Sequence, residues 1–522
     1  MLLPQPLLRA LRQIPLLTLA VLGFHAAAAP PNILFIFADD HAWQAVSAYE
    51  HPLKLNQTPN IDRLAKDGVT FQRCLVPNSI CGPSRAIVMT GKYSHKNGFY
   101  NNVNNTFDGT QQTFPKLLHS AGYQTAVIGK WHLISEPTGF DFWAIWPGQG
   151  IYYNPPMSVM GKTEKKPGYV TDITTDMALD WLKARDPNRP FLMMCQHKAP
   201  HREWAPALRH LGHDNDRKYP EPETLFDDYA NRGPAVHAQD MTISKTMRLG
   251  VDNKLTAPTS MTPEQRKEWD AYYGPRNAAF TNAHLAGKEL VRWKYQRYLH
   301  DYLGTVKAVD ESVGRLLNYL DQTGLATNTI VVYSSDQGFF LGEHGWFDKR
   351  WIFEESARTP LLIRWPGVTP KAAQNRDLVS VVDFAETFLE AAGLPVPADM
   401  QGRSLVPLLR GQTPADWRKS FYYHYYEDGG EHKVAKHYGV ITDRYKLAHF
   451  YNLQPPYWEL YDLQKDPQEM RSVFGQTDYA DAQKELEKEL ARLRKELQVP
   501  EKDAPRSDPK YKPAAAPKPG GK

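Results

Sequence analysis

Two continuous runs of apolar residues predict strands that are buried on both faces. The first run covers residues 32–38 (NILFIFA), and the second covers residues 329–335 (TIVVYSS). A half-exposed strand alternates apolar and polar residues, whereas a strand of a parallel sheet covered by helices is apolar almost throughout. We therefore expect both runs to lie in a mostly parallel central sheet.

An amphipathic helix is predicted just before the second run. Its apolar residues recur at intervals of three, four and seven positions, the spacing of one helix face. They are Leu303, Val306, Val313, Leu317 and Leu320. A short loop containing Gly324 would join this helix to the strand, and the order helix, loop, strand is typical of α/β proteins.

Other parts of the chain differ in composition and in the pattern of apolar residues. Residues 204–283 are polar, rich in proline and without a sustained period, which predicts long surface loops able to shape a cleft. Residues 421–426 and 438–441 are short β-prone runs suited to an antiparallel sheet. A helix rich in Glu, Lys and Leu is expected from about residue 480 to residue 497.

The first 29 residues have the features of a secretory signal peptide. Arg9 and Arg12 precede an apolar run at residues 14–24, and four alanines occupy positions 26–29. A membrane anchor is the alternative, but the run is shorter than the roughly 20 residues that a span needs. No cysteine follows the leader to carry a lipid, so we expect a periplasmic or secreted protein without a membrane span.

These observations divide the chain into four parts. We expect a signal peptide at 1–29, a catalytic α/β domain at 30–410, a C-terminal α+β subdomain at 411–498 and a disordered tail at 499–522. The tail is composed largely of Pro, Lys, Ala and Gly, which cannot form a packed core.

Charge and cysteine content narrow the functional classes. The chain has 522 residues with 62 basic and 58 acidic side chains, so its formal charge of +4 falls to 4 − 2 = +2 without the two leader arginines. This balance argues against a nucleic-acid-binding protein, which would carry a strongly basic domain or patch.

Cys74, Cys81 and Cys195 cannot form a disulfide framework and lack the paired spacing of a zinc site. An odd cysteine in an exported protein therefore needs an explanation.

Acidic residues follow both predicted strands. Asp39 and Asp40 end the first run, and Asp336 and Gln337 end the second. Ligands of open α/β sheets bind outside the carboxyl ends of strands, where these four side chains would meet. Their oxygens suit a hard cation, and calcium accepts such a mixed, irregular shell more readily than magnesium. The alternative is that each pair caps a helix or turn.

A cysteine motif lies between the two strands. Cys81-Gly82-Pro83-Ser84-Arg85 leads into a short apolar helix that ends in Thr90-Gly91. A residue at a helix start lies near free backbone N–H groups, where an anionic ester binds well, and Arg85 one turn later can face the same ester. A structural thiol and an ordinary catalytic cysteine with a histidine base are the alternatives.

The string Cys-x-Pro-Ser-Arg followed by Thr-Gly resembles the signature of the formylglycine-dependent sulfatases of the alkaline phosphatase superfamily. Further blocks resemble that family in the same order: Asp39-Asp40, Gly129-Lys130-Trp131-His132, Lys198-Ala199-Pro200-His201, Asp336-Gln337-Gly338 and Lys349 before Glu354-Glu355-Ser356. The resemblance covers about residues 32–470. It implies a large α/β domain with a mostly parallel sheet between helices, and a smaller C-terminal antiparallel sheet with a helix.

The resemblance also implies a mechanism. A maturation enzyme would oxidise Cys81 to formylglycine, whose hydrate attacks sulfur, leaving Cys74 and Cys195 as buried thiols. Other roles follow from motif position: calcium binding by Asp39, Asp40, Asp336 and Gln337; sulfate neutralisation by Arg85, Lys130 and Lys349; protonation of the leaving sugar oxygen by His201, with or without Lys349; and collapse of the sulfated hydrate assisted by His132. Gln337 replaces the Asn of many family members.

The substrate expectation is a sulfated carbohydrate. Residues 137–141, 147–150 and 200–204 resemble the bacterial branch near the N-acetylglucosamine-6-sulfatases, so 6-O-sulfated N-acetylglucosamine of a host or algal glycan is the first hypothesis. Glu427 and His437, in the tyrosine-rich C-terminal part, are candidate substrate-binding residues. A phosphate or phosphonate ester hydrolase of the same superfamily remains an alternative. A catalytically inactive sulfoglycan-binding protein is another, although it would not need Cys81, Arg85 and both cation-binding pairs.

Overall fold

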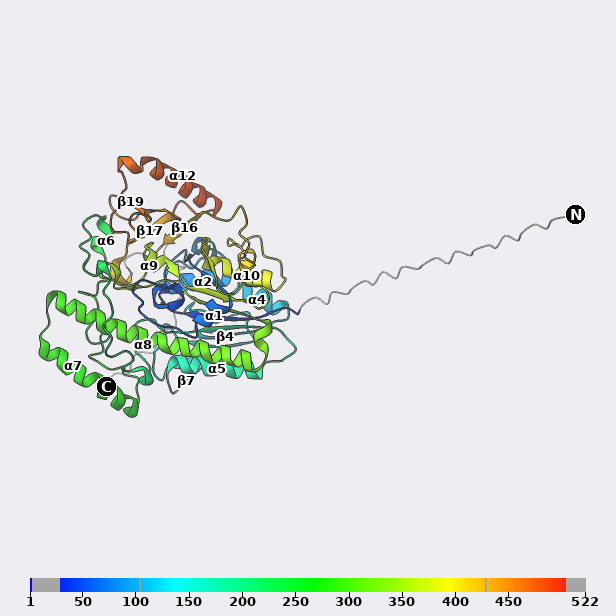
Figure 1. Ribbon diagram of the computed structural model, residues 1–522, viewed down its shortest axis with the longest axis horizontal. Helices are drawn as coiled ribbons and strands as arrows, with labels where there is room; N and C mark the ends of the chain where they lie inside the picture. The colour runs from blue at the N-terminus through cyan, green and yellow to red at the C-terminus, as the bar shows by residue number, and fades with distance from the viewer. Residues whose placement is uncertain (2–28, 104, 428–429, 504–522) are drawn as a thin grey trace.

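The protein is built around a central sheet of ten strands (Figure 1). The computed structural model describes Met1 and residues 29–103, 105–427 and 430–503. Most of the predicted signal peptide, and the predicted tail from residue 504 onward, lie outside these described residues, so both assignments remain predictions.

The middle of this sheet is parallel, as the apolar runs predict. Strand β1 lies between β8 and β9, and β4 and β5 continue the parallel order beyond β8. Antiparallel strands occur toward both edges. In sheet order the strands are β14 (Ala373–Asn375), β2 (Val69–Phe71), β13 (Leu361–Arg364), β9 (Thr329–Ser335), β1 (Asn32–Ala38), β8 (Phe191–Gln196), β4 (Gln124–Lys130), β5 (Phe142–Trp146), β6 (Pro156–Val159) and β7 (Lys162–Lys165).

Helices cover both faces of the sheet. In chain order they are α1 (Asp62–Asp67), α2 (Cys81–Thr90), α3 (Ser94–Asn97), α4 (Phe114–Ser120), α5 (Val170–Ala184), α6 (Pro234–Ala238), α7 (Pro263–Ala283), α8 (Gly287–Gln322), α9 (Glu354–Ala357), α10 (Phe384–Ala391), α11 (Val406–Leu409) and α12 (Ala480–Glu496). Helices α5 and α8 lie on one side, and α2, α4 and α10 lie on the other (Figure 1). Short strands β3 (Cys74–Leu75), β10 (Phe340–Leu341), β11 (Phe347–Asp348), β12 (Arg358–Thr359) and β15 (Val379–Ser380) complete this part.

Strand β1 shows why its sequence is apolar throughout. Phe35 and Phe37 pack into the core cluster formed with α2, α4 and α10, whereas Leu34 and Ile36 pack into the cluster formed with α5 and α8. Every residue of the strand is buried. From Ile33 to Ala38, alternate side chains therefore face two hydrophobic cores, and both faces favour apolar residues.

The register of the parallel strands brings their carboxyl ends to one edge. Ala38 pairs with Ser335, so Asp39 and Asp336 both follow directly after a matched pair of residues. On the other side of β1, Gln196 of β8 pairs with Phe37, one residue before that match. The ends of β1 and β9 thereby meet at a single edge of the sheet, as the sequence predicts, and the structure adds the end of β8.

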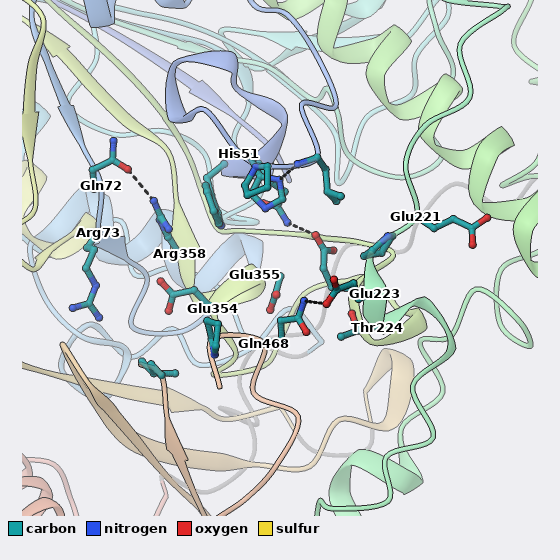
Figure 2. Close-up of a pocket in the computed structure, with 18 of the residues that line it drawn as sticks. His51, Gln72, Arg73, Glu221, Glu223, Thr224, Glu354, Glu355, Arg358 and Gln468 are labelled. Carbon is teal, nitrogen blue, oxygen red and sulfur yellow. Dashed lines mark hydrogen bonds between the residues drawn. The ribbon is translucent and has the colours of Figure 1, made fainter. Parts of the chain in front are cut away.

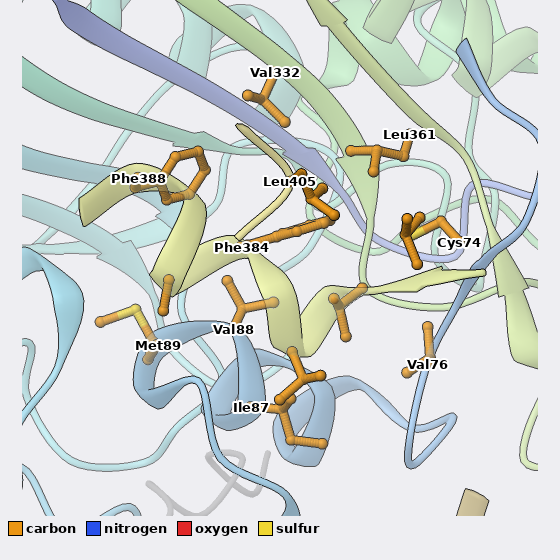
Figure 3. Close-up of a cluster of buried hydrophobic side chains, with 14 of the residues drawn as sticks. Cys74, Val76, Ile87, Val88, Met89, Val332, Leu361, Phe384, Phe388 and Leu405 are labelled. Atoms are coloured by element: carbon orange, nitrogen blue, oxygen red, sulfur yellow. The ribbon is translucent and has the colours of Figure 1, made fainter. Parts of the chain in front are cut away.

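Helix α2 is held rigidly behind this edge. All ten of its residues are buried, and Ile87 and Val88 pack toward Phe384 and Phe388 of α10 (Figure 3). The helix ends at Gly91, whose φ of 65° is a left-handed conformation that glycine adopts without strain. This packing fixes the first turn of α2, where the predicted nucleophile precursor lies.

The C-terminal part forms the predicted small antiparallel sheet. Its strands are β16 (Ser420–Tyr425), β17 (His437–Thr442), β18 (Tyr445–Phe450) and β19 (Tyr457–Asp462), paired in sequence order. Helix α12 packs with this sheet through Leu486, Leu490 and Leu493, a spacing of four and three residues. The predicted helix is thus confirmed to within one residue at its end.

The prediction of loops throughout residues 204–283 is wrong for its last quarter. Helix α7 occupies Pro263–Ala283, and it begins with a capping box in which Thr262 and Gln265 bond to each other's backbone. Only Trp269 and Tyr273, four positions apart, are buried on this helix. Two buried residues are too few to produce a detectable helical period of apolar residues. The motif Thr-x-x-Gln with proline in the first turn did indicate the start of a helix.

Two further findings concern residues across the described chain. Cys74, Cys81 and Cys195 are all buried and none forms a disulfide, which confirms the predicted buried thiols. Among the described residues no helix combines the length and the apolar character required to cross a membrane.

Replacing Phe388 with alanine tests the packing that supports α2. The Phe388 ring lies 5.4 Å from the Phe35 ring and 5.1 Å from the Phe114 ring, so its removal leaves a cavity between sheet and helices. We expect Phe388→Ala to lower the free energy of unfolding by about 3–5 kcal/mol, measured by guanidinium unfolding. Val396→Ala, at a position 40% exposed, is the control and should change it little. A loss below about 1 kcal/mol for Phe388→Ala would contradict this packing.

Candidate active site

Three buried carboxylates lie together at the carboxyl edge of the sheet. Asp39 and Asp40 follow β1, Asp336 follows β9, and each is fully buried. One oxygen from each carboxylate lies within 4.8 Å of the others. The backbone N–H of Asp40 donates to Asp336 Oδ1 at 3.1 Å, which ties the two strand ends together. The sequence prediction that both acidic pairs meet is therefore confirmed.

Three cations surround these carboxylates. Lys130, the last residue of β4, contacts Asp39 Oδ2, and Lys349 lies 2.6 and 2.7 Å from the two oxygens of Asp40. Arg85 of α2 lies 2.9 Å from Asp336 Oδ2. All are buried, so each charge is offset by an opposite one, as burial away from water requires.

The three carboxylates nevertheless differ in how readily they ionise. Burial and the neighbouring Asp39 and Asp336 carboxylates raise the pKa of Asp40 to about 7. Burial and Asp39 raise the pKa of Asp336 to about 6. Asp39 behaves differently: despite its burial, Lys130 and the other nearby cations hold its pKa well below the usual value. A further positive charge at this edge would stabilise the ionised forms of Asp40 and Asp336.

Arg85 holds the site together through its planar guanidinium. Its Nε donates to Asp336 Oδ2 at 3.0 Å, and its Nη1 donates to the Lys130 carbonyl at 2.8 Å and to Gln196 Oε1 at 2.7 Å. These partners come from β9, β4 and β8, so one side chain of α2 connects three strand ends. Lysine has no fork of donors to reproduce this arrangement.

Cys81 is the first residue of α2 and faces this cluster. Its Sγ lies within 4.8 Å of an Asp39 oxygen and a His201 ring nitrogen, and 4.0 Å from Gln337 Nε2. Burial and the negative charge of Asp39 raise the pKa of the thiol well above its usual range. A thiolate is therefore disfavoured here, which argues against the alternative of an ordinary cysteine nucleophile.

The donor set fits a hard divalent cation. Asp39 Oδ1 and Gln337 Oε1 are buried and have no hydrogen-bond partner in the described structure. The Gln337 amide donates through Nε2 to Asp40 Oδ1, so its oxygen is left free. Buried oxygens without partners are costly, and three carboxylates with an amide oxygen are ligands that calcium accepts. Asp39, Asp40, Asp336 and Gln337 would hold such an ion.

Two histidines from the predicted set lie at the same cluster. His201 has Nε2 3.8 Å from Asp40 Oδ2, and its Nδ1 bonds to the Arg202 carbonyl at 2.7 Å. His132 follows β4 with a φ of 56°, and its Nδ1 is buried without a partner. Burial and the Lys130 ammonium hold the pKa of both rings well below the usual value, so both are neutral at pH 7.

A pocket of about 540 Å³ opens over Cys81. Cys81, His201 and Lys349 line it, whereas Arg85 and Lys130 are buried and do not line it. Glu427, a predicted substrate-binding residue, lines the wall and accepts a hydrogen bond from Asn102 N at 3.2 Å. Residues 248 and 258–260 also line the pocket, so the long segment after residue 204 does shape the cleft, as expected.

His437, the other predicted substrate-binding residue, is not brought to this pocket. It is fully buried in β17, where its Nε2 accepts from Ile352 N at 3.1 Å and its Nδ1 donates to the Ala435 carbonyl at 2.8 Å. Burial lowers its pKa to about 4. Both ring nitrogens are occupied, so the side chain has a structural role in joining the small sheet to the large domain.

The sequence analysis missed several residues that line the pocket wall. Asp348 and Arg350 flank Lys349, and His432 Nε2 lies 2.9 Å from Asp348 Oδ2. Arg350 is 5% exposed, yet its Nε and Nη1 have no hydrogen-bond partner among the described atoms. Lys198 lies two residues after the end of β8, and the sequence analysis noted it only as part of a motif. The run of three charged residues, Asp348-Lys349-Arg350, between aromatic residues was the available signal.

A second cavity, of about 780 Å³, lies elsewhere between the large domain and the small sheet (Figure 2). Glu354, Glu355 and Arg358 line it, and the Arg358 guanidinium lies 3.7 Å from the centre of the Trp43 ring. None of the predicted catalytic, metal-binding or substrate-binding residues lines this cavity. We therefore assign the active site to the smaller pocket, which contains Cys81.

Two family models match the chain. One is described as "Sulfatase" and matches residues 31–394, and the other, "N-sulphoglucosamine sulphohydrolase, C-terminal", matches residues 342–496. An N-acetylglucosamine-6-O-sulfatase of Bacteroides thetaiotaomicron is 51% identical over 508 residues, covering 92% of this chain and 90% of that protein. The N-acetylglucosamine-6-sulfatase of Homo sapiens is 29% identical over 445 residues, covering 79% of this chain and 70% of that protein.

A solved structure supports the same likeness. It is 51% identical to this chain, superposes with a TM-score of 0.88, and covers 90% of this chain and 99% of the other. That protein was solved in complex with its substrate, D-glucosamine-2-N,6-O-disulfate.

Proposed function

The chain belongs to the sulfatase family and is a sulfuric ester hydrolase, and from this premise we propose that it removes the 6-O-sulfate of sulfated N-acetylglucosamine or a related glucosamine. The observation that carries the proposal is Cys81 at the start of α2, facing three buried carboxylates and three cations. The 51% identity to an N-acetylglucosamine-6-O-sulfatase supports the sugar, and the 6-sulfated substrate of the solved relative agrees with it.

The surroundings of Cys81 suit a residue that is converted before it acts. The thiol is buried beside Asp39, which suppresses its ionisation, so an unmodified cysteine would be a poor nucleophile. We propose that a maturation enzyme converts Cys81 to formylglycine, which would supply a hydrate with one hydroxyl to attack sulfur and another to expel the sulfate. Asn102 Oδ1 accepts from Gly82 N at 3.0 Å and steadies the chain next to this position.

We further propose that calcium is the ion held by Asp39, Asp40, Asp336 and Gln337. When bound, it would attract a sulfate oxygen and lower the pKa of a hydroxyl beside it. The unpartnered oxygens of Asp39 and Gln337 support this assignment, as do the raised pKa values of Asp40 and Asp336.

The cations of the cluster bind and orient the sulfate. Lys130 is bonded to Asp39 and Lys349 to Asp40, and both ammonium groups are close enough to Cys81 to act on it electrostatically. Arg85 remains bonded to Asp336 and serves mainly to fix the strand ends. Charge that builds on the sulfate oxygens during the reaction is stabilised without any movement of these side chains, because they are already held in place.

The two histidines are placed to accept protons. His201 Nε2 faces the carboxylates and the pocket, and the neutral ring has a lone pair on that nitrogen because Nδ1 donates to the Arg202 carbonyl. His132 Nδ1 is likewise unpartnered and buried beside Lys130. We propose that these nitrogens take up protons from hydroxyl groups that ionise during attack and collapse.

The part of the pocket lined by Asp348, Arg350 and Glu427 suits neutral sugar hydroxyls. Arg350 offers unpartnered donors, while Asp348 and Glu427 offer acceptors, and Arg350 lies 3.8 Å from Asp348 and 4.0 Å from Glu427. Because the guanidinium charge is already balanced by carboxylates, this wall favours hydrogen bonding to hydroxyls over binding of a further anion. The pocket volume of about 540 Å³ is large enough to hold a sugar ring.

A phosphate or phosphonate ester hydrolase is the nearest alternative within the superfamily. The sulfatase family match and the glucosamine sulfatase relative favour sulfate over phosphate. We also propose that the enzyme acts in the periplasm or outside the cell, on the basis of the predicted leader at residues 1–29.

The proposed activity is tested by measuring sulfate release. We expect the enzyme, coexpressed with a formylglycine-generating enzyme, to release sulfate from N-acetylglucosamine-6-sulfate, detected by ion chromatography, and Cys81→Ala to release none. For a matched pair of aryl sulfate and aryl phosphate esters, kcat/KM should be at least about 100-fold higher for the sulfate. Each tenfold of this preference corresponds to about 1.4 kcal/mol of activation free energy. Preference for the phosphate would overturn the proposal. Turnover of another sulfated sugar alone would overturn only the choice of sugar.

Cation binding should depend on pH. Asp40, with a pKa of about 7, and Asp336, with a pKa of about 6, take up protons as the pH falls, and protons compete with the cation for the same oxygens. We therefore expect calcium affinity to fall steadily below about pH 7. The measurement is calorimetric titration of protein from which metal ions have been removed with a chelator. Asp336→Asn should weaken binding strongly, whereas Asp240→Asn, on an exposed side chain, should not. Affinity that is constant from pH 8 to pH 5, or full recovery of activity with magnesium, would count against a calcium site.

A further inference from the structure

Helix α2 begins without a polar capping residue of its own. Ile80 occupies the N-cap position, and its apolar side chain cannot accept a hydrogen bond from the N–H groups of the first turn. Pro83 has no N–H, and Ser84 N donates to the Ile80 carbonyl at 3.0 Å. The N–H of Gly82 donates instead to Asn102 Oδ1 at 3.0 Å. A side chain 20 residues away therefore replaces the missing cap, at the residue that follows the nucleophile precursor.

Gly82 and Asn102 approach each other so closely that their relative position is fixed. A Cβ atom at position 82 would lie 2.6 Å from Asn102 Oδ1 and 2.6 Å from the Phe99 ring, so a larger residue does not fit there without movement. Asn102 also lines the pocket that contains Cys81. Because Gly82 and Cys81 share a peptide bond, a displacement of Asn102 would change where the side chain at position 81 enters the pocket.

Asn102 is held in turn by the wall of the pocket. Its backbone N donates to Glu427 Oε2 at 3.2 Å, and Glu427 is 4% exposed. The other carboxylate oxygen of Glu427 lies 4.0 Å from Arg350 Nη1. Two residues before Asn102, the Tyr100 carbonyl accepts from Asn78 Nδ2 at 3.0 Å. A chain of contacts thus runs from the pocket wall through Asn102 to the first turn of α2.

We propose that Asn102 is a positioning residue for the nucleophile, and that Glu427 acts on the reaction through Asn102. The inference rests on the proposed sulfatase reaction at Cys81. Asn102 Oδ1 fixes the Gly82 peptide and with it the direction of the attacking group, while Glu427 fixes Asn102. Correct orientation of a reacting group accounts for a large part of enzymatic rate enhancement. A sugar that contacts Glu427 would therefore also steady the residue that attacks its sulfate.

The acceptor at position 102 is a neutral amide, and its charge can be tested separately from its hydrogen bond. An aspartate has an oxygen in the same place and can accept from Gly82 N. Its negative charge, however, would repel a sulfate ester in the same pocket. Loss of the acceptor should therefore lower kcat, whereas an added charge should raise KM.

Two substitutions of Asn102 use this difference. We expect Asn102→Ala to lower kcat by about 10- to 100-fold on both N-acetylglucosamine-6-sulfate and 4-nitrophenyl sulfate, with little change in KM, because the misplaced nucleophile is common to both substrates. Asn102→Asp should restore most of kcat but raise KM. Asn188→Ala, at an exposed position, is the control. Mass spectrometry must show equal formylglycine content in all variants, so that kcat reports the orientation of the residue and not its yield.

Glu427 variants test the second link. Glu427→Leu removes the acceptor for Asn102 N, and Glu427→Gln retains a carbonyl oxygen for it. On 4-nitrophenyl sulfate, which has no sugar hydroxyls, we expect Glu427→Leu to lower kcat by about tenfold and Glu427→Gln to lose much less. The double variant Asn102→Ala/Glu427→Leu should be no slower than Asn102→Ala alone, because both changes break the same chain of contacts.

The results that would overturn the inference are distinct. Wild-type kcat in Asn102→Ala, or a kcat in Asn102→Asp as low as in the alanine variant, would show that the hydrogen bond does not position the nucleophile. The aspartate variant decides this point if the alanine variant does not fold. A loss in Glu427→Leu that is confined to the sugar substrate, or additive losses in the double variant, would restrict Glu427 to sugar binding. Failure of the wild-type, formylglycine-containing enzyme to release sulfate from any ester would instead overturn the proposed function.

Discussion

The structure depends on one constraint: three carboxylates are buried at a single sheet edge and must be balanced there. Asp39, Asp40 and Asp336 are delivered by the parallel register of β1 and β9, and Lys130, Lys349 and Arg85 arrive from three other segments to offset them. An unpaired buried charge costs several kcal/mol, so none of these segments can move independently of the others. The apolar packing of α2 against α10 supports this arrangement, because it holds Arg85 where it reaches Asp336, Lys130 and Gln196.

This arrangement divides the pocket into two functional halves. One half contains fixed charges, unpartnered oxygens and neutral histidines around Cys81, which suits chemistry on an anionic sulfate ester. The other half contains Arg350 beside Asp348 and Glu427; its charge is balanced and its Nε and Nη1 have no partner among the described atoms, which suits recognition of hydroxyl groups. In the proposed reaction, chemistry and sugar recognition therefore use different residues.

Much of the fold and of the reactive half could be predicted from the sequence. The strands at 32–38 and 329–335 are apolar because both faces are buried, and the acidic residues after them must share an edge in any parallel sheet. Helix α7 was missed because only Trp269 and Tyr273 on it are buried. Arg350 and Lys198 could not be assigned, because only the packed structure reveals that Arg350 Nε and Nη1 lack hydrogen-bond partners among the described atoms and that Lys198 forms no ion pair there. His437 shows the reverse error: a polar residue among tyrosines suggested a ligand, but both its nitrogens bond to backbone groups.

The central claim is that Cys81 is the precursor of the nucleophile and not the nucleophile itself, and the oxidation state of this residue tests it most directly. Trypsin should release a peptide of residues 74–85 that contains both Cys74 and Cys81, so Cys74 serves as an internal reference thiol. The measurement is mass spectrometry of this peptide from active enzyme after alkylation. The account predicts one alkylated cysteine at position 74 and an aldehyde at position 81. Two alkylated cysteines in enzyme that is fully active on a sulfate ester would contradict it.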